Sequence, residues 1–323
     1  MTRSVATLLA TVLLLPAATA LAQDWPQRPV RIIAPFGVGG TADIVSRFVA
    51  DHLSATFKQQ FIVENRTGAG GAIGAQAIAK AEPDGYTLGV TNLTTMSLVP
   101  VIAPKTPYNP IKDFTHIAYI AGAPVMLAVH PSTKVKTVAE FVEYAKAGGK
   151  PLTFASAGVG SDGHVMGEAI GGALKIGVSH VPYRSTVQGL TDAAGGHVVF
   201  STLTSASTST FIRAGTLHPL AVTSPQRLTD WPDVPTFREL GHPSLVSSTW
   251  YALSAPAGFP RPVAVRLHAE LSTFLARPDV QKQLSRYGLL PEAMSMEAFN
   301  RFVANEGARW KPMIEAANLA GKE

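Results

Sequence analysis

An apolar, strand-like segment runs three times into a glycine- or hydroxyl-rich turn and then into a helical pattern. The three turns lie at residues 36–41, 66–71 and 155–161. Alternating strands and helices are typical of an α/β protein with a mainly parallel sheet covered on both faces. In such folds, ligands bind outside the carboxyl ends of the strands. We therefore expect all three turns to lie at a ligand cleft.

The chemistry of these turns favours an anion. Glycine lets the backbone approach a ligand closely, and the first amides of the following helix have no partner within that helix. The helix dipole adds a partial positive charge at the same end. The turns therefore predict the capture of a carboxylate or phosphate more than its chemical conversion.

The N-terminal segment is typical of an export signal. Arg3 supplies the positive start, residues 5–15 are apolar, Pro16 breaks the run, and Ala20 and Ala22 fit a small-residue cleavage site. The apolar run is shorter than the ~20 residues of an ordinary membrane-spanning helix. We expect a protein exported to the periplasm; a retained N-terminal anchor is the alternative.

The composition excludes several classes of function. The chain has no Cys, so it has neither disulfides nor a thiolate metal site. Its formal net charge is only +5 and its basic residues are scattered, which does not favour nucleic-acid binding. The His residues form no HExxH motif and no tight cluster with acids, so we expect no metal and no cofactor.

Near residue 122 the alternation starts again, which predicts two α/β domains that face each other across the cleft. We divide the chain into a signal peptide (1–22), a discontinuous first domain (23–124 plus 250–323) and a second domain (125–249). The expected strands lie at 30–34, 61–64, 86–91, 125–129, 152–155, 178–181, 198–203, 217–223 and 250–254. The expected helices begin near 41 and lie at 72–81, 138–147, 163–174, 187–194, 262–275, 278–287 and 296–319.

Two enzyme-like patterns in the third turn are incomplete. Gly158, Gly160 and Gly163 match G-x-G-x-x-G, but no acid follows about 20 residues later to bind a ribose. Ser161 lacks a nucleophile elbow, since Val159 stands two residues before it. Ser161 fits a helix N-cap, with or without ligand contact. His164 either binds an anion or caps and packs the helix.

The remaining candidates each have a structural alternative. Asp43 fits a cap for its own helix better than a ligand contact. Arg66 binds a carboxylate or pairs with Glu64, whereas for Arg184 we favour ligand contact over a solvated charge.

Hydroxyl side chains occupy all but two of positions 201–210. Most of them suit turns and caps, while one or two that face the cleft would hold a second polar end of the ligand. Phe36 and Tyr183 form either apolar walls of the pocket or core contacts.

The order of these segments resembles the Bug family, the extracytoplasmic solute receptors of tripartite tricarboxylate transporters. The resemblance covers essentially the whole mature chain. The matching segments lie at 25–29, 33–43, 63–71, 83–86, 112–114, 158–164, 180–183, 220–224 and 232–236.

The resemblance implies a type II periplasmic-binding-protein fold whose two domains close like a flytrap on an organic acid. It implies that the first two turns hold one carboxylate, through Gly39, Gly40, Thr41, Ala69, Gly70 and Gly71. The second domain would contribute Ser156, Gly160, Ser161 and His164, with Tyr183 and Arg184 nearby. It further implies a monomeric, non-enzymatic receptor that delivers its ligand to membrane components of the transporter.

The chain also departs from the family pattern. Val38 stands where Pro is usual, Arg184 where Lys is common, and Val199 and Phe200 where an acid often occurs. Without that acid, a ligand ammonium would lack a counter-charge.

Arg184 with Thr202 and Ser205 instead suits a second carboxylate. We therefore expect a dicarboxylate, aromatic if Phe36 and Tyr183 line the pocket. A carboxylate sensor and, less favoured, a secreted serine hydrolase using Ser161 and His164 are the alternatives.

Overall fold

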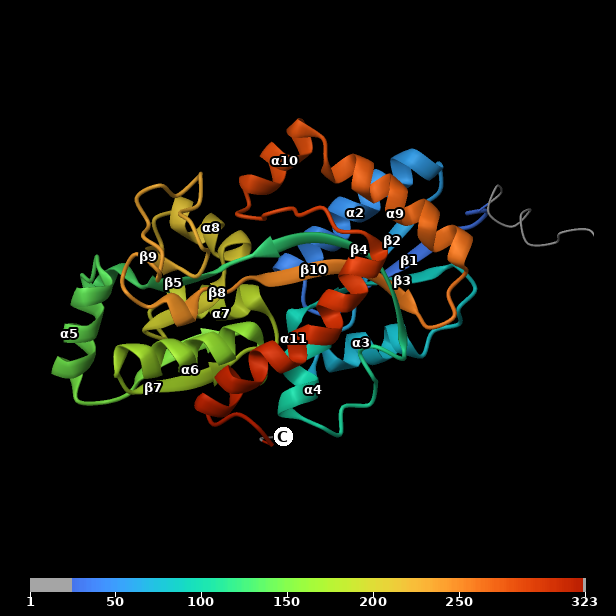
Figure 1. Cartoon of the computed structure of the whole chain (residues 1–323). Coiled ribbons are helices and arrows are strands. Elements are labelled where there is room, and N and C mark those ends of the chain that lie inside the picture. Colours follow the sequence, from blue (N-terminus) through green and yellow to red (C-terminus); the bar gives the residue numbers. More distant parts are fainter. Residues whose placement is uncertain (1–24, 322–323) are drawn as a thin grey trace, which may run out of the picture.

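The computed structural model describes residues 25–321, and within them the chain forms two five-stranded sheets with helices on both faces (Figure 1). The predicted signal peptide lies outside the described residues. The first sheet has the order β2 (Phe61–Asn65), β1 (Val30–Ala34), β3 (Thr87–Asn92), β10 (Thr249–Pro256), β4 (Phe114–Ala123). The second has the order β7 (Val178–Pro182), β6 (Leu152–Ser156), β8 (Phe200–Thr204), β5 (Val125–Val129), β9 (His218–Val222). We call each sheet with its helices a lobe.

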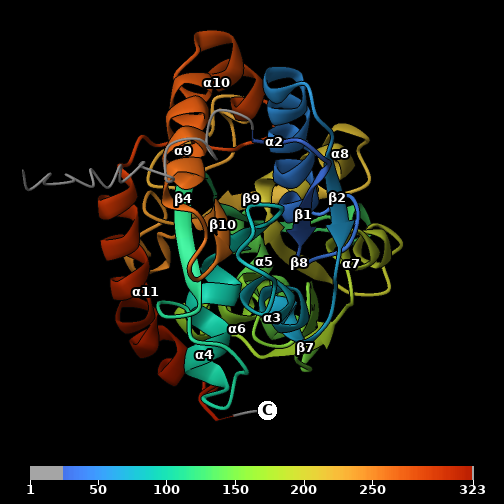
Figure 2. The ribbon, with the colours of Figure 1, turned by 90° about the vertical axis from the view of Figure 1, so that its right-hand side faces the viewer.

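Helices complete both lobes, and Figures 1 and 2 show them around the sheets. The first lobe contains α2 (Thr41–Phe57), α3 (Ala72–Ala79), α4 (Val99–Ile102), α9 (Arg261–Leu275), α10 (Pro278–Ser285) and α11 (Met296–Ala316). The second contains α5 (Val138–Gly148), α6 (Asp162–Leu174), α7 (Thr186–Ala194) and α8 (Ser205–Arg213). The two-lobed α/β architecture predicted from the sequence is confirmed.

Strand directions differ from the expected mainly parallel sheets. In each sheet two pairings are parallel and two are antiparallel, because β10 runs against β3 and β4 while β5 runs against β8 and β9. The antiparallel strands are the ones next to the crossings between the lobes. The sheets are therefore mixed.

The chain crosses between the lobes twice. Only Pro124 separates β4 of the first sheet from β5 of the second, and Thr223 bonds to Val125 where β5 begins. The chain returns through β10, which starts at Thr249 and pairs with β3 and β4. The expected strand at 250–254 therefore returns to the first sheet as predicted, while the residue bounds of the domains stay a prediction.

Strand β1 shows why the sheets need helices on both faces. Ile32 and Ile33 are consecutive, so they point to opposite faces, yet both are fully buried. Ile32 packs in the cluster of Val45 and Val49 from α2, and Ile33 in that of Ile78 from α3. Burial of each such side chain stabilises the fold by about 1.5–3 kcal/mol.

A buried carboxylate fastens the C-terminal helix to the first sheet. Glu306 of α11 accepts hydrogen bonds from the indoles of Trp250 (3.0 Å) and Trp310 (3.2 Å) and pairs with Arg309 (2.9 Å). The apolar residues Phe299, Val303 and Ile314 continue the same helix face into the core. Within residues 25–321, no helix combines the length and apolarity that crossing a bilayer requires.

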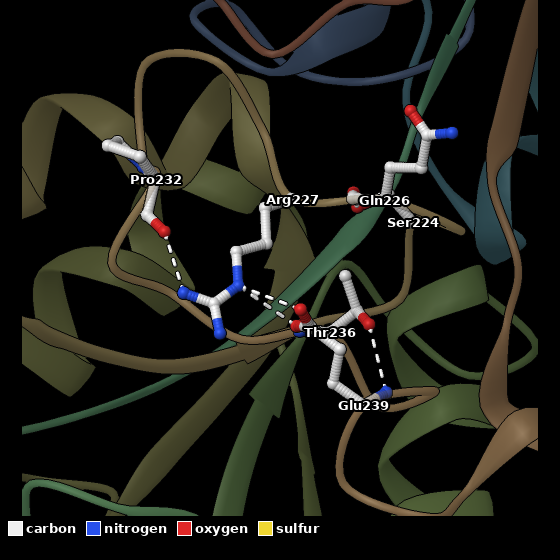
Figure 3. Close-up of polar contacts among 6 residues, drawn as sticks. All are labelled: Ser224, Gln226, Arg227, Pro232, Thr236 and Glu239. Atoms are coloured by element: carbon white, nitrogen blue, oxygen red, sulfur yellow. Dashed lines mark hydrogen bonds and ion pairs between the residues drawn. The ribbon is translucent and has the colours of Figure 1, made fainter.

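The segment after β9 is held by its own side chains (Figure 3). Thr236 and Glu239 form a reciprocal capping box, with a bond from the Thr236 amide to the carboxylate (2.8 Å) and one from the Glu239 amide to the hydroxyl (3.1 Å). Arg227 donates to Glu239 (2.9 Å) and to the carbonyl of Pro232 (2.9 Å). The motif at 232–236 therefore has a structural role in shaping this loop.

Candidate functional site

The first glycine turn lies directly against the second lobe. A Cβ added to Gly37 would come within 2.7 Å of the Ser185 Cβ, which is closer than real Cβ contacts. Ser185 is the N-cap of α7. The backbone of the first turn can therefore reach the second lobe only because residue 37 lacks a side chain.

The second turn meets the third in the same way. Residues 68–71 all have positive φ, including Ala69 at 48°, an uncommon conformation for a residue with a Cβ. A Cβ on Gly70 would come within 2.8 Å of the Val159 carbonyl oxygen. All three turns thus lie where the two lobes touch.

Asp43 holds the first turn in shape. Its carboxylate accepts hydrogen bonds from the Gly39 amide (3.0 Å), the Asn65 side chain (2.9 Å) and Arg47 (3.0 Å). Burial alone would raise the pKa of Asp43, but these donors, Arg47 foremost, keep that pKa below its ordinary value. Asp43 lies in the first turn of α2, as the sequence indicated, but its carboxylate binds the preceding turn and does not cap the α2 amides.

Five backbone amides at this junction have no acceptor among residues 25–321. Three belong to Thr41, Ala42 and Asp43 in the first turn of α2, and two to Ala69 and Gly70. Neither the Gly40 N-cap of α2 nor the Gly71 N-cap of α3 carries a side chain that could cap. Thr41, Ala42, Asp43 and Gly70 are buried, and unpaired donors on buried backbone are rare in folded proteins, so these amides indicate where a ligand acceptor fits.

Not every predicted donor is available. The amide of Gly39 donates to Asp43, that of Gly40 to the Gly37 carbonyl (3.2 Å), and that of Gly71 to the Gly68 carbonyl (2.9 Å). These glycines shape the turns, whereas the adjacent residues supply the donors.

The third turn differs, because the amides at the start of its helix already have acceptors. The Ser161 hydroxyl accepts from the His164 amide (3.3 Å), and the Asp162 amide donates to Thr94 of the first lobe (3.2 Å). The Asp162 carboxylate also accepts a bond from the Gly163 amide. The start of α6 therefore has no comparable set of open donors, and the predicted N-cap role of Ser161 is confirmed.

Two histidines support this turn. The ring of His164 accepts from the Gly160 amide (3.1 Å) and stacks on His180 at 3.7 Å between ring centroids. The Ser156 hydroxyl forms a hydrogen bond with His180 (2.5 Å) and accepts one from the Gly158 amide (3.2 Å). Burial, followed by the effect of His164, lowers the pKa of His180 to about 3. Ser161 and His164 do not form the nucleophile–base pair of a serine hydrolase, because the Ser161 hydroxyl accepts a hydrogen bond from the backbone amide of His164.

Hydroxyl groups from the second lobe reach the first turn. The hydroxyl of Thr41 lies 2.6 Å from that of Thr204 and 2.8 Å from that of Ser207. The buried hydroxyl of Tyr251 bonds to Thr41, Asn92 and Thr204, and burial raises its pKa well above the ordinary value. A polar centre made by both lobes thus adjoins the open amides of α2.

The two hydroxyls singled out from the sequence point elsewhere. Thr202 donates to the carbonyl of Gly163 (2.7 Å), and Ser205 donates to that of Gly288 (3.3 Å). The structure therefore brings Thr204 and Ser207, and not Thr202 and Ser205, to the first turn. The tract also forms helix α8, where the sequence favoured turns and caps.

The two aromatic candidates, Phe36 and Tyr183, lie in different surroundings. Phe36 is buried beneath the second turn, with its ring 2.9 Å from a Cβ placed on Gly71. Tyr183 lies against α7, and its pKa rises to about 12 through burial and a hydrogen bond to Asp192. Tyr183 therefore packs on the helix that follows it in the chain.

The two arginines have different surroundings. Arg66 pairs with Glu64 (2.7 Å), which was the structural alternative. Arg184 is exposed, and residues 25–321 give it no ion pair.

Asp162 and Tyr251 were missed from the sequence. Asp162 is buried, accepts a hydrogen bond from Thr249 at the start of β10 (2.5 Å), and has a pKa raised by burial. The only local signal was an acid directly after a predicted N-cap. Its partners, Thr94 and Thr249, are far away in the chain, so this link between the lobes had no sequence signature.

Two α/β lobes joined by crossing strands, with glycine turns and open amides between them, define a periplasmic-binding-protein architecture. Within residues 25–321, no group of three or more acidic or histidine side chains is arranged to hold a metal ion. A family profile described as the tripartite tricarboxylate transporter family receptor matches residues 45–319. The chain belongs to this family, as its resemblance to Bug proteins indicated.

Solved structures of similar proteins agree with this assignment. The periplasmic binding protein BugD is 29% identical, with a TM-score of 0.87, over 92% of this chain and 100% of its own. Rpa4515 of R. palustris with adipate is 31% identical, with a TM-score of 0.89 and coverages of 92% and 100%. MatC from Rhodopseudomonas palustris with bound malate is 32% identical, with a TM-score of 0.83 and coverages of 90% and 100%.

Proposed function

We propose that this protein is a periplasmic receptor that binds a dicarboxylate between its lobes and presents it to the membrane components of a tripartite tricarboxylate transporter. The observation that carries the proposal is the set of open amides at Thr41–Asp43 and Ala69–Gly70 where the lobes meet. A carboxylate supplies the acceptors that these donors lack, and the α2 dipole favours its charge. The first carboxylate of the ligand binds there.

The second lobe completes the site. Thr204 and Ser207 bring hydroxyls to Thr41, and the third turn, with Gly160 and its supporting side chains Ser156 and His164, closes over Gly70. Because both lobes contribute contacts, the ligand favours the closed arrangement over the open one. Binding energy drives closure, and no covalent step is needed.

The ligand class follows from chemistry and from relatives. The family is named for tricarboxylate transport, and two similar structures hold the dicarboxylates adipate and malate. A serine hydrolase is not favoured, since the Ser161 hydroxyl caps α6. The receptor works as an exported monomer after loss of residues 1–22.

Calorimetry and thermal shift with mono-, di- and tricarboxylates test the proposal. We expect at least one dicarboxylate to bind with 1:1 stoichiometry and to raise the melting temperature. A protein that binds phosphate esters or cations but no carboxylate would refute the proposal. Uptake of the labelled acid in a strain that lacks this protein then tests transport. Loss of a transport receptor would abolish uptake, whereas loss of a sensor that binds the same acid would leave uptake intact.

A further inference from the structure

An apolar cavity of about 360 Å³ lies beside the second and third turns. Its volume is within the range of small-molecule sites, roughly 300–1,000 Å³. Both lobes line it: Ala69, Ala72, Val99, Ile102, Ala103 and Pro107 come from the first, and Val159 and Gly160 from the second. The cavity is therefore complete only when the second and third turns meet.

One charged side chain lies at this cavity. Lys105 lines it beside Thr106, in the segment that follows α4. Lys105 is exposed, and the structure gives it no hydrogen bond or ion pair within residues 25–321. A lysine of this kind lays its alkyl stem along an apolar wall and keeps its ammonium free for an anion.

We propose that this cavity receives the far half of the ligand, whose second carboxylate pairs with Lys105. The inference rests on the proposed function and deepens it, because it specifies a dicarboxylate with an apolar spacer. The near carboxylate binds the open amides, among them those of Ala69 and Gly70, whose turn also walls the cavity. The spacer then bridges the two turns, so that ligand length is coupled to lobe closure.

The cavity also sets the selectivity. Its walls carry methyl, isopropyl and proline groups, and a hydroxyl on the spacer would lose its hydrogen bonds to water there. Arg184, the candidate for the second carboxylate from the sequence, is exposed and does not line this cavity. Pairing of the second carboxylate with Lys105 and pairing with Arg184 therefore predict opposite effects of the two substitutions on dicarboxylate affinity.

Calorimetric titrations of adipate, hexanoate and malate into the full chain and its variants test this inference. The variants are Lys105→Gln, Arg184→Gln and, as a matched exposed lysine outside the cavity, Lys112→Gln. Loss of one charged hydrogen bond corresponds to about a tenfold change in affinity. We expect Lys105→Gln to weaken adipate about tenfold and hexanoate less than twofold, while the other two variants match the parent chain.

A second variant tests the cavity without touching charge. Ala103→Leu places bulk in the cavity, and we expect it to weaken adipate and hexanoate together while malate binding is kept. Equal adipate affinity in Lys105→Gln and parent would overturn the inference, as would a loss confined to Arg184→Gln. Malate binding in the same titrations would leave the proposed function standing, whereas absence of any carboxylate binding would overturn both.

Discussion

The hydroxyl of Thr41, the first residue of α2, lies 2.6 Å from the hydroxyl of Thr204, the last residue of β8. The bond joins the two lobes beside the open amides, and both residues are buried, with Thr41 3% and Thr204 5% exposed. Opening of the lobes separates these hydroxyls, so the pair favours the closed state. A carboxylate bound to the α2 amides lies beside this pair and further stabilises the closed state.

Thr204→Val should weaken ligand binding more than it weakens the fold. The change keeps the shape but removes a hydroxyl bond worth about 1 kcal/mol, or roughly fivefold in dissociation constant. Calorimetry with a binding dicarboxylate measures the loss. Thr202→Val is the matched control, because it removes the bond to Gly163 within the second lobe; it should lower the melting temperature and leave affinity unchanged. Equal affinities in both variants would contradict a role for Thr204 in closure.

Gly70→Ala should impair closure. The new Cβ would come within 2.8 Å of the Val159 carbonyl, and φ at this position is +59°, which disfavours alanine. We expect affinity for the dicarboxylate to fall at least tenfold, since a clash of this kind costs more than about 1.4 kcal/mol. Gly148→Ala, at a site with nothing within 4 Å of the added Cβ, is the control and should bind as the parent does. Unchanged affinity in Gly70→Ala would show that these turns do not meet in the bound state.

Asp162→Asn should stabilise the protein at neutral pH. Burial raises the pKa of Asp162, so its ionised form opposes folding, and this cost grows as pH rises through the folded pKa. The amide variant keeps an acceptor for Thr249 and does not ionise. Urea unfolding at pH 4.5 and pH 7.5 should show a gain that is larger at the higher pH. A gain independent of pH would contradict a raised pKa, because the folded and unfolded chains would then bind the same number of protons at Asp162 over this pH range.

His116 should destabilise the protein in acid. Burial lowers its pKa from 6.5 to about 4, so between these values the unfolded chain takes up a proton that the folded chain does not. Stability present above pH 6.5 is therefore lost as pH falls toward 4, by about 3 kcal/mol in total.

The pH dependence of unfolding checks this directly. In His116→Gln the slope of unfolding free energy against pH should fall by about one proton between pH 6 and 4.5. If His116→Gln kept the parent slope, a different group would account for the acid sensitivity.

Local sequence predicts most elements of this fold but not β4, α4 or α8, and it predicts the strand directions poorly. Strand β1 and the start of α2 lie where apolar runs and glycines placed them, and β5 has its predicted bounds. The antiparallel direction of β10 could not be predicted from the sequence, because it depends on the lobe from which the chain returns. Helix α8 forms from poor helix-forming Ser and Thr residues, since its start is buried and bonded to the Pro124 carbonyl.

The candidate site likewise has features that the local sequence predicts and features that it does not. The first two turns could be read as anion sites because glycines before a helix have a local signature. The sequence could not show that Thr204, and not Thr202, reaches the first turn. Both residues lie on one strand face, and they differ only in their distance from the end of the strand. Asp162 was hidden because its partners come from the other lobe and the crossing strand.

Strand β10 lies between β3 and β4, although 156 residues separate the end of β3 from the start of β10 along the chain. Until residues 249–256 are available, β4 has no neighbour in its own sheet, whereas every strand of the second sheet comes from residues 125–222. Closing so long a loop is slow, because its entropy cost precedes the contacts that reward it. We therefore expect the second lobe to fold first and the lobe that holds the first strand of the chain to be assembled last.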